Sequence, residues 1–78
     1  SVTAALAHPD VEAAIDRADD AGTARRFLER VTEADPALAE RLVEVPVVRD
    51  ALVAISCASR SLSNAIVAEP SLVDVLDD

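Results

Sequence analysis

The stretch VVRDALVAISCASRSLSNAIVA, residues 47–68, decides whether this chain folds as one long helix or as several short ones. Its large apolar residues stay in helical phase throughout, so an unbroken helix from Val47 to Ala68 is geometrically allowed. That helix would place Ser59 on its apolar side, which is a mild cost, because serine is favoured at helix caps and indifferent inside helices. Periodicity alone therefore leaves both structures open.

Prolines mark further helix starts on both sides of this stretch. A proline suits the first turn of a helix, because the N–H that it lacks would have no partner there. Each of the four prolines stands at the head of an amphipathic segment: Pro9, Pro36, Pro46 and Pro70. We also expect a short helical turn over residues 2–7, before the first of them.

Two further boundaries follow from the residues between these segments. Gly22 is expected to end one helix and Thr23 to cap the next, which should end near Ala34. Asp35 is expected to cap the helix that Pro36 opens. The loops between the helices are therefore short, and neighbouring helices must pack closely.

The residues expected to face inward recur at helical spacing in every segment. They are Val11, Ala14, Ile15 and Ala18, then Ala24, Phe27, Leu28 and Val31, then Leu38, Ala39, Leu42 and Val43, then Val48, Ala51, Leu52 and Ile55, and finally Leu72, Val75 and Leu76. No segment shows the period-two alternation of a strand. The sequence predicts an all-α fold, a bundle of about five short amphipathic helices with short loops.

Composition bounds the size and character of the core. The chain has 78 residues, which make one helical domain or one piece of a larger protein. Its apolar share is 51%, yet it has one phenylalanine and no tyrosine or tryptophan, so the core must be aliphatic. A thin aliphatic core of this kind leaves homo-oligomerisation open.

Net charge excludes two classes of partner. The formal net charge is −8 and every cationic side chain is an arginine, so nucleic acid and anionic membrane surfaces are poor partners. The uninterrupted apolar runs are too short to span a bilayer. No secretory signal is visible and the single cysteine cannot form an internal disulfide, so we expect a reducing cytoplasm.

Two residues bear groups that could take part in catalysis. Cys57 could act as a nucleophile, but it would need a base or a cationic pocket beside it. The single histidine, His8, is distant in sequence and precedes Pro9, where a role at the helix start is natural. We therefore interpret Cys57 as a small, largely apolar core residue and predict no catalytic residue in this chain.

Other polar groups also receive structural interpretations. The acidic pairs Asp19–Asp20 and Asp77–Asp78 are neighbours in sequence, so on a helix they point in different directions and do not form a metal clamp. Ser61–Leu62 lies at a helix start, as does the carrier serine of acyl carrier proteins, but it follows Arg60 rather than an aspartate. We predict no cofactor-binding and no metal-binding residue.

The C-terminal half carries a recognisable family pattern. An apolar helix is followed by a small residue and a serine, an apolar position three residues on, a polar residue, an aliphatic pair, a proline and a final aliphatic helix. The residues that match are Arg49, Leu52, Ser59, Leu62, Asn64, Ile66, Val67, Pro70 and Leu76. In this pattern residues 47–78 resemble the N-terminal helical region of glutamine synthetase adenylyltransferases, and residues 24–43 are compatible with its preceding helices. The chain departs from the pattern at Cys57, where many members have glycine, and at Glu69, where histidine is usual.

The resemblance implies a place beside a catalytic domain. Enzymes of this family have two nucleotidyltransferase domains, one removing AMP from a tyrosine of glutamine synthetase and the other attaching it from ATP. This chain would be a non-catalytic helical segment that packs on the first of them. The ATP and Mg²⁺ of such an enzyme would be bound by the catalytic domains, whose motif of paired acidic residues does not occur here, and glutamine synthetase would be the partner of the whole enzyme.

The resemblance also bears on the opening stretch. Family members commonly place proline or aspartate directly after the serine, and both residues suit a first helical turn. We therefore predict that Ser59 caps a new helix from Arg60 to about Ala68, with its side-chain oxygen accepting from the N–H of Ser61 or Leu62. The alternative to an adenylyltransferase segment is an independent helical interaction or dimerisation module.

Overall fold

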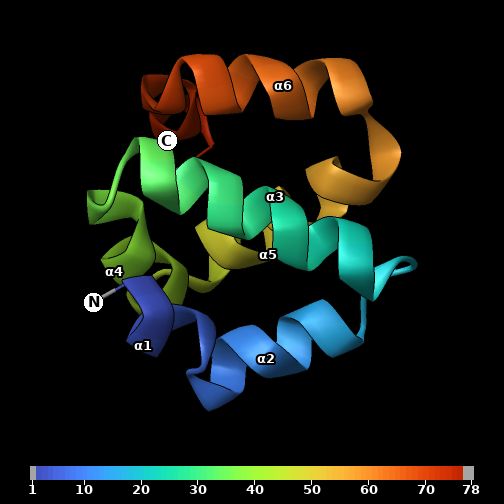
Figure 1. Cartoon of the computed structure of the whole chain (residues 1–78), viewed down its shortest axis with the longest axis vertical. Coiled ribbons are helices and arrows are strands. Elements are labelled where there is room, and N and C mark those ends of the chain that lie inside the picture. The colour runs from blue at the N-terminus through green and yellow to red at the C-terminus, as the bar shows by residue number, and fades with distance from the viewer. Residues whose placement is uncertain (1, 77–78) are drawn as a thin grey trace.

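Helix starts and stops along the chain produce seven short elements. The computed structural model describes residues 2–76, which form six α-helices and one 3-10 helix and contain no strand (Figure 1). The helices are α1 (Val2–Leu6), α2 (Pro9–Asp16), α3 (Ala21–Ala34), α4 (Ala37–Glu44), α5 (Pro46–Ala58), α6 (Arg60–Ala68) and the 3-10 helix η1 (Pro70–Val75). The predicted all-α bundle is confirmed, including the short first helix and the end of α3 at Ala34.

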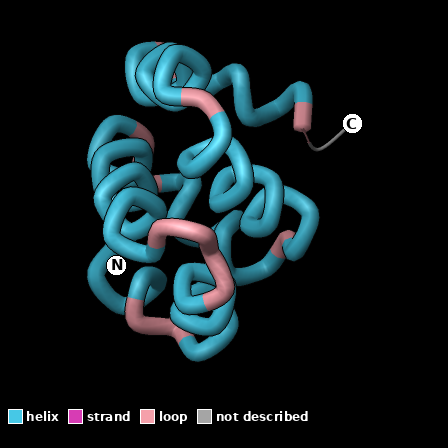
Figure 2. Tube along the Cα trace, turned by 90° about the vertical axis from the view of Figure 1, so that its right-hand side faces the viewer, coloured by secondary structure: helices cyan, strands magenta, loops and turns pink. Residues whose placement is uncertain are grey.

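The two longest helices, α3 and α5, form the centre of the bundle. They pack against each other, and α6 and α2 lie on opposite sides of them (Figure 1). Helices α1 and α4 pack together at the remaining end, and η1 folds back against α6. The loops are short everywhere in the described chain (Figure 2), and each helix contacts its neighbours in sequence.

The core is aliphatic, with one aromatic ring in it. Phe27 on α3 is 4% exposed, and the side chains that surround it are valines, leucines, isoleucines and alanines. The fully buried ones of the largest volume are Ile15, Leu28, Leu38, Leu42, Leu52, Ile66, Val11, Val31, Val48 and Val73. Most of the residues expected to face inward are buried, whereas Ala18, Val43 and Ile55 are partly buried at the edge of this core.

The chain breaks at Ser59, as predicted. Ser59 has an extended backbone (φ −147°, ψ 108°), and its N–H still donates to the carbonyl of Ile55 at the end of α5. Its side-chain oxygen accepts from the N–H of Leu62 at 3.1 Å, so the same residue ends α5 and begins α6. This cap satisfies one of the N–H groups that a helix start leaves without a partner.

The break changes which residues of α6 face the core. Leu62, expected on the apolar side, is 42% exposed, whereas Ser63 is 7% exposed. The Ser63 hydroxyl donates to the carbonyl of Ser59 at 2.8 Å, which removes the penalty of burying it. The helical phase of α5 therefore does not continue into α6, because the extended Ser59 turns the chain.

The start of α3 differs from the expectation. Asp20, not Thr23, is its N-cap: the carboxylate accepts from the N–H of Thr23 at 3.1 Å and from its hydroxyl at 2.8 Å. Gly22 lies inside the helix with an ordinary φ and does not end α2, which finishes at Asp16. Aspartate is among the best capping residues, and Thr23, three positions on, has the N–H that such a cap requires.

The helix after Asp35 starts one residue later than expected. The side chain of Asp35 accepts from the N–H of Ala37 at 3.1 Å, but the N-cap of this helix is Pro36, so the prediction that Asp35 caps it is wrong. The first residue of α4 is Ala37, and Pro36 stands just before it. Helix boundaries shift by a residue in this way whenever the first turn is tight.

The last element is a 3-10 helix, and its inward face is not the one expected. Val73 is fully buried, whereas Leu72 is 36% and Val75 is 72% exposed. A 3-10 helix has three residues per turn, so residues three apart share a face. Val73 and Leu76 are three apart, and Leu76 packs against the core as predicted while Val75 does not.

Candidate functional site

The structure places the two reactive side chains in different grooves. Cys57 lies in a surface groove of about 450 Å³ between the end of α2 and α5, and its Sγ contacts the carbonyl oxygen of Asp20 at 3.7 Å. His8 lies in a second groove of about 470 Å³, between α1 and α4. Its Nδ1 accepts from the N–H of Asp10 at 3.2 Å, which makes His8 the N-cap of α2. The predicted role of His8 at a helix start is therefore confirmed.

The Cys57 groove is lined by both charged and small apolar residues. Asp19 and Asp50 line it together with Arg17, and the remaining lining is mainly alanine. Cys57 is partly buried and packs against the core, in line with the interpretation of a small, largely apolar residue. The hydrogen-bond partners of its thiol are the Ser56 hydroxyl and the carbonyl oxygen of Asp20, each at 3.7 Å.

The two residues of the acidic pair Asp19–Asp20 lie in different parts of the structure. Asp19 lines the Cys57 groove, whereas Asp20 caps α3, so the two carboxylates serve different environments. Hydrogen bonds from the backbone and hydroxyl of Thr23 lower the pKa of Asp20 below its ordinary value of 3.8, and Arg26 lowers it further. Asp77–Asp78 lies outside the described residues. Within residues 2–76 no group of three or more acidic, histidine or cysteine side chains is arranged to hold a metal ion.

Arg49, one of the residues that carry the resemblance, contacts backbone. Its Nη1 donates to the carbonyls of Leu42 and Val43 at 3.2 and 3.3 Å. These are among the last carbonyls of α4, which have no partner inside the helix, so the guanidinium group joins the end of α4 to the start of α5. Its Nε is buried without a partner. Arg49 thus has a structural role.

Ser61, which was compared with the carrier serine of acyl carrier proteins, is exposed in the first turn of α6.

A third pocket has a different character from the other two. It has a volume of about 320 Å³ and lies between α3, the end of α5 and the first half of α6. Three arginines line it: Arg26 and Arg30 from α3, and Arg60 from α6. Its other lining residues are Thr23, Phe27, Ser56, Ser63 and Asn64, so no carboxylate lines it. We call this site the arginine pocket.

Among residues 2–76, no direct ion pair involves an arginine of the arginine pocket. The ion pairs in the described chain are Arg25–Glu12 at 2.6 Å and Arg41–Asp74 at 2.8 Å, which are on other faces. Arg30 reaches across to α6, where its Nη1 lies 3.5 Å from the Asn64 side-chain oxygen. The spacing of Arg26 and Arg30 on one helix was visible in the sequence, but the approach of Arg60 was not, because it depends on how α6 folds back.

Comparisons with known proteins do not place the chain in a family. No family model matches it, and neither the curated proteins nor the solved structures give a match. In residues 2–76, no helix combines the length and the apolar character needed to cross a membrane.

Proposed function

We propose that this chain is a non-catalytic helical docking domain that packs on an adjacent nucleotidyltransferase domain. In this proposal the whole protein is similar to the glutamine synthetase adenylyltransferases and acts in the cytoplasm. The neighbouring domain would bind ATP and Mg²⁺, and glutamine synthetase would be the substrate protein. The helices described above would supply a rigid surface and no reacting group.

The observation that supports this proposal is where apolar side chains remain exposed. Four large apolar residues in residues 2–76 are at least 36% exposed, and three of them, Leu62, Leu72 and Val75, lie in the C-terminal pair α6–η1. The fourth, Val47, lies on α5. Apolar surface is stabilised when water is removed from it, so α6–η1 has more to gain from a protein partner than the rest of the bundle.

The same pair lies within the segment that resembles the family, residues 47–78. In the resemblance, this segment directly precedes the first catalytic domain. Leu62 matches the family pattern and yet is not used by the core of this bundle. A large apolar side chain that does not pack in the core of its own domain can instead pack against another domain.

Two observations test the proposal: the coding sequence of the parent gene and a binding measurement. The reading frame after Asp78 should encode a strand with paired acidic residues, and that domain, produced separately, should bind this chain. Leu62→Ser and Val75→Ser should each weaken the complex about tenfold, the loss expected when a well-packed apolar contact is removed. Val47→Ser is the matched control, because it removes an equally exposed apolar side chain outside α6–η1.

Two results would contradict the proposal. One is a reading frame that stops or continues without a nucleotidyltransferase motif. The other is a chain that self-associates at micromolar concentration in sedimentation experiments, with Val75→Ser abolishing the association. The second result would favour an independent dimerisation module.

A further inference from the structure

The arginine pocket concentrates positive charge in a strongly acidic chain. The sequence has 15 acidic side chains and 7 arginines, and three of those arginines line this one pocket. Two others form ion pairs elsewhere, and Arg49 is bonded to the end of α4. The cluster brings together residues from two helices that are distant in sequence, so it is a product of the fold and not of a local charge run.

We propose that the arginine pocket binds a phosphate group, either as the free ion or as the terminal phosphate of a small molecule. A guanidinium group presents a planar fork of N–H donors that matches the oxygens of a phosphate, and three arginines line this pocket. This inference does not depend on the proposed docking function, because the pocket lies between α3 and α6 and uses none of the exposed apolar residues.

The floor and walls of the pocket suit a compact ligand. The ring of Phe27 is buried beneath it, and Ser56 and Ser63 are buried with their hydroxyls already donating to the carbonyls of Val53 and Ser59. The donors still available to a ligand are therefore the guanidinium groups and the amide of Asn64. Arg60 also stands in the first turn of α6, where the helix dipole favours an anion.

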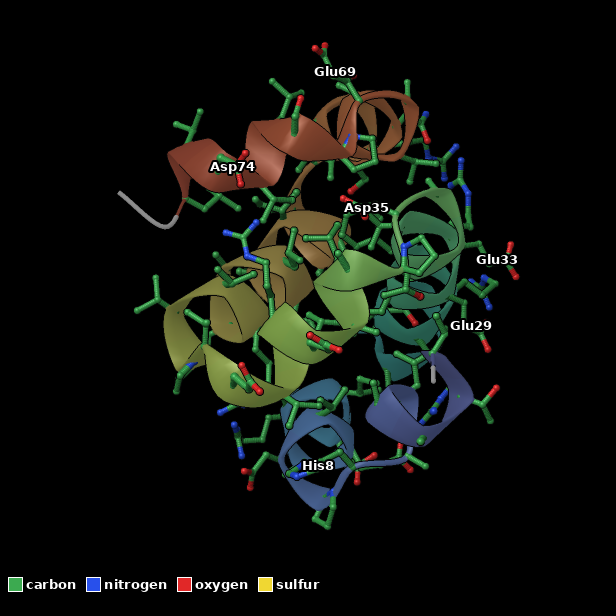
Figure 3. The ribbon with its side chains drawn as sticks, turned by 90° about the vertical axis from the view of Figure 1, so that its left-hand side faces the viewer. His8, Glu29, Glu33, Asp35, Glu69 and Asp74 are labelled. Atoms are coloured by element: carbon green, nitrogen blue, oxygen red, sulfur yellow. The ribbon has the colours of Figure 1, made fainter. Side chains whose placement is uncertain are left out.

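The surroundings favour a small anion over a long one. Glu29 and Glu33 project outward from α3, the helix that also bears Arg26 and Arg30 (Figure 3), and Asp20 interacts electrostatically with Arg26. The pocket lining thus has three cationic and no acidic side chains, whereas the whole chain has a formal net charge of −8. A polymer of phosphates would extend over acidic surface and be repelled, whereas a single phosphate group interacts with the three arginines alone.

The three arginines of the pocket differ in their side-chain hydrogen bonds. The Nη2 of Arg26 lies 3.4 Å from the Thr23 hydroxyl oxygen, and the Nη1 of Arg30 lies 3.5 Å from the side-chain oxygen of Asn64. Arg60 has no side-chain hydrogen bond within residues 2–76 and can rotate toward a ligand. Two positioned cations and one adaptable cation allow closure on a ligand without movement of the helices.

The experiment is a titration followed by amide NMR at constant ionic strength. Inorganic phosphate and glycerol 3-phosphate are added separately, with chloride as the reference anion. We expect saturable shifts at Thr23, Arg30, Arg60 and Asn64 with phosphate or its ester and none with chloride. Tighter binding of the ester assigns a small phosphorylated molecule, and tighter binding of the ion assigns free phosphate.

Matched variants separate the pocket from net charge. Arg30→Gln and Arg60→Gln should each weaken binding about tenfold, because each removes one charge-assisted contact. Arg17→Gln removes the same charge from the opposite groove and should leave the affinity unchanged. All three side chains are exposed, so the variants should keep the wild-type melting temperature. Shifts that do not saturate, or an equal loss in Arg17→Gln, would overturn the proposal.

Discussion

At the scale of single residues, helix caps determine where the elements of this chain begin. Asp20, Ser59 and His8 each accept a backbone N–H at the start of a helix. The sequence predicts Ser59 as a cap, because serine is favoured at helix caps and the family resemblance implies a break there. Asp20 was not foreseen, because Asp19, Asp20 and Thr23 are all good capping residues and the sequence alone does not choose among them.

The cap at Asp20 makes stability depend on pH. Because its pKa in the folded state lies below the ordinary value of 3.8, ionised Asp20 stabilises the fold above that value, and this contribution disappears as pH falls through the lowered pKa. Asp20→Asn keeps an accepting oxygen but cannot titrate, so its melting temperature should fall less steeply with acid than that of the wild type. Melting curves between about pH 2 and pH 7 measure the difference.

The neighbouring Asp19 supplies the control for that experiment. Asp19→Asn removes the same charge but leaves the cap of α3 in place. Asp20→Ala, which has no accepting oxygen, should be less stable than Asp20→Asn at neutral pH. An acid-side slope that is the same in Asp20→Asn and the wild type would show that this carboxylate does not contribute to the pH dependence.

At the scale of the elements, the type of helix decides which face is buried. The segment after Pro70 has apolar residues at 72, 73, 75 and 76, which is compatible with more than one helical period. In an α-helix, Leu72, Val75 and Leu76 would share a face, whereas the observed 3-10 helix turns Val73 inward and Val75 outward. A proline start and a segment of six residues favour the tighter helix, because its hydrogen bonds close over three residues.

This assignment predicts different costs for two neighbouring valines. Val73→Ala should lower the free energy of unfolding by about 2 kcal/mol, since it removes two buried methyl groups and leaves a small cavity. Val75→Ala should change it by less than about 0.5 kcal/mol, because that side chain is largely in water. Urea unfolding measures both, and equal or reversed costs would show that the segment is α-helical in solution.

At the scale of the whole molecule, a thin aliphatic core supports seven short helices. A domain of this length is stabilised by only about 4–12 kcal/mol in total. Its core is made almost wholly of aliphatic side chains, most of them on α2 to α6, and the central helices α3 and α5 pack against each other. Loss of a single large side chain from the centre should therefore remove a large share of the stability.

Leu52 tests this dependence directly. It is fully buried on α5. Leu52→Ala should therefore lower the free energy of unfolding by about 3 kcal/mol and the melting temperature by roughly ten degrees or more. Leu62→Ala removes the same atoms from a side chain that is 42% exposed and should cost about 1 kcal/mol or less. Comparable losses in the two variants would mean that the core is not centred where the structure places it.

The sequence by itself determined the helical class, the role of Pro9, Pro46 and Pro70 at helix starts, and most of the buried face of α2 to α5. These features depend on local backbone preferences and on the spacing of apolar residues, and both can be read from a single sequence. Only the tertiary structure decided the phase of α6 and η1, the cap of α3 and the arginine pocket. In each case several local solutions have nearly equal energy, and the choice among them depends on which helix lies alongside. Arg26 and Arg60 are 34 positions apart in the sequence, and only the return of α6 across α3 brings them to one pocket.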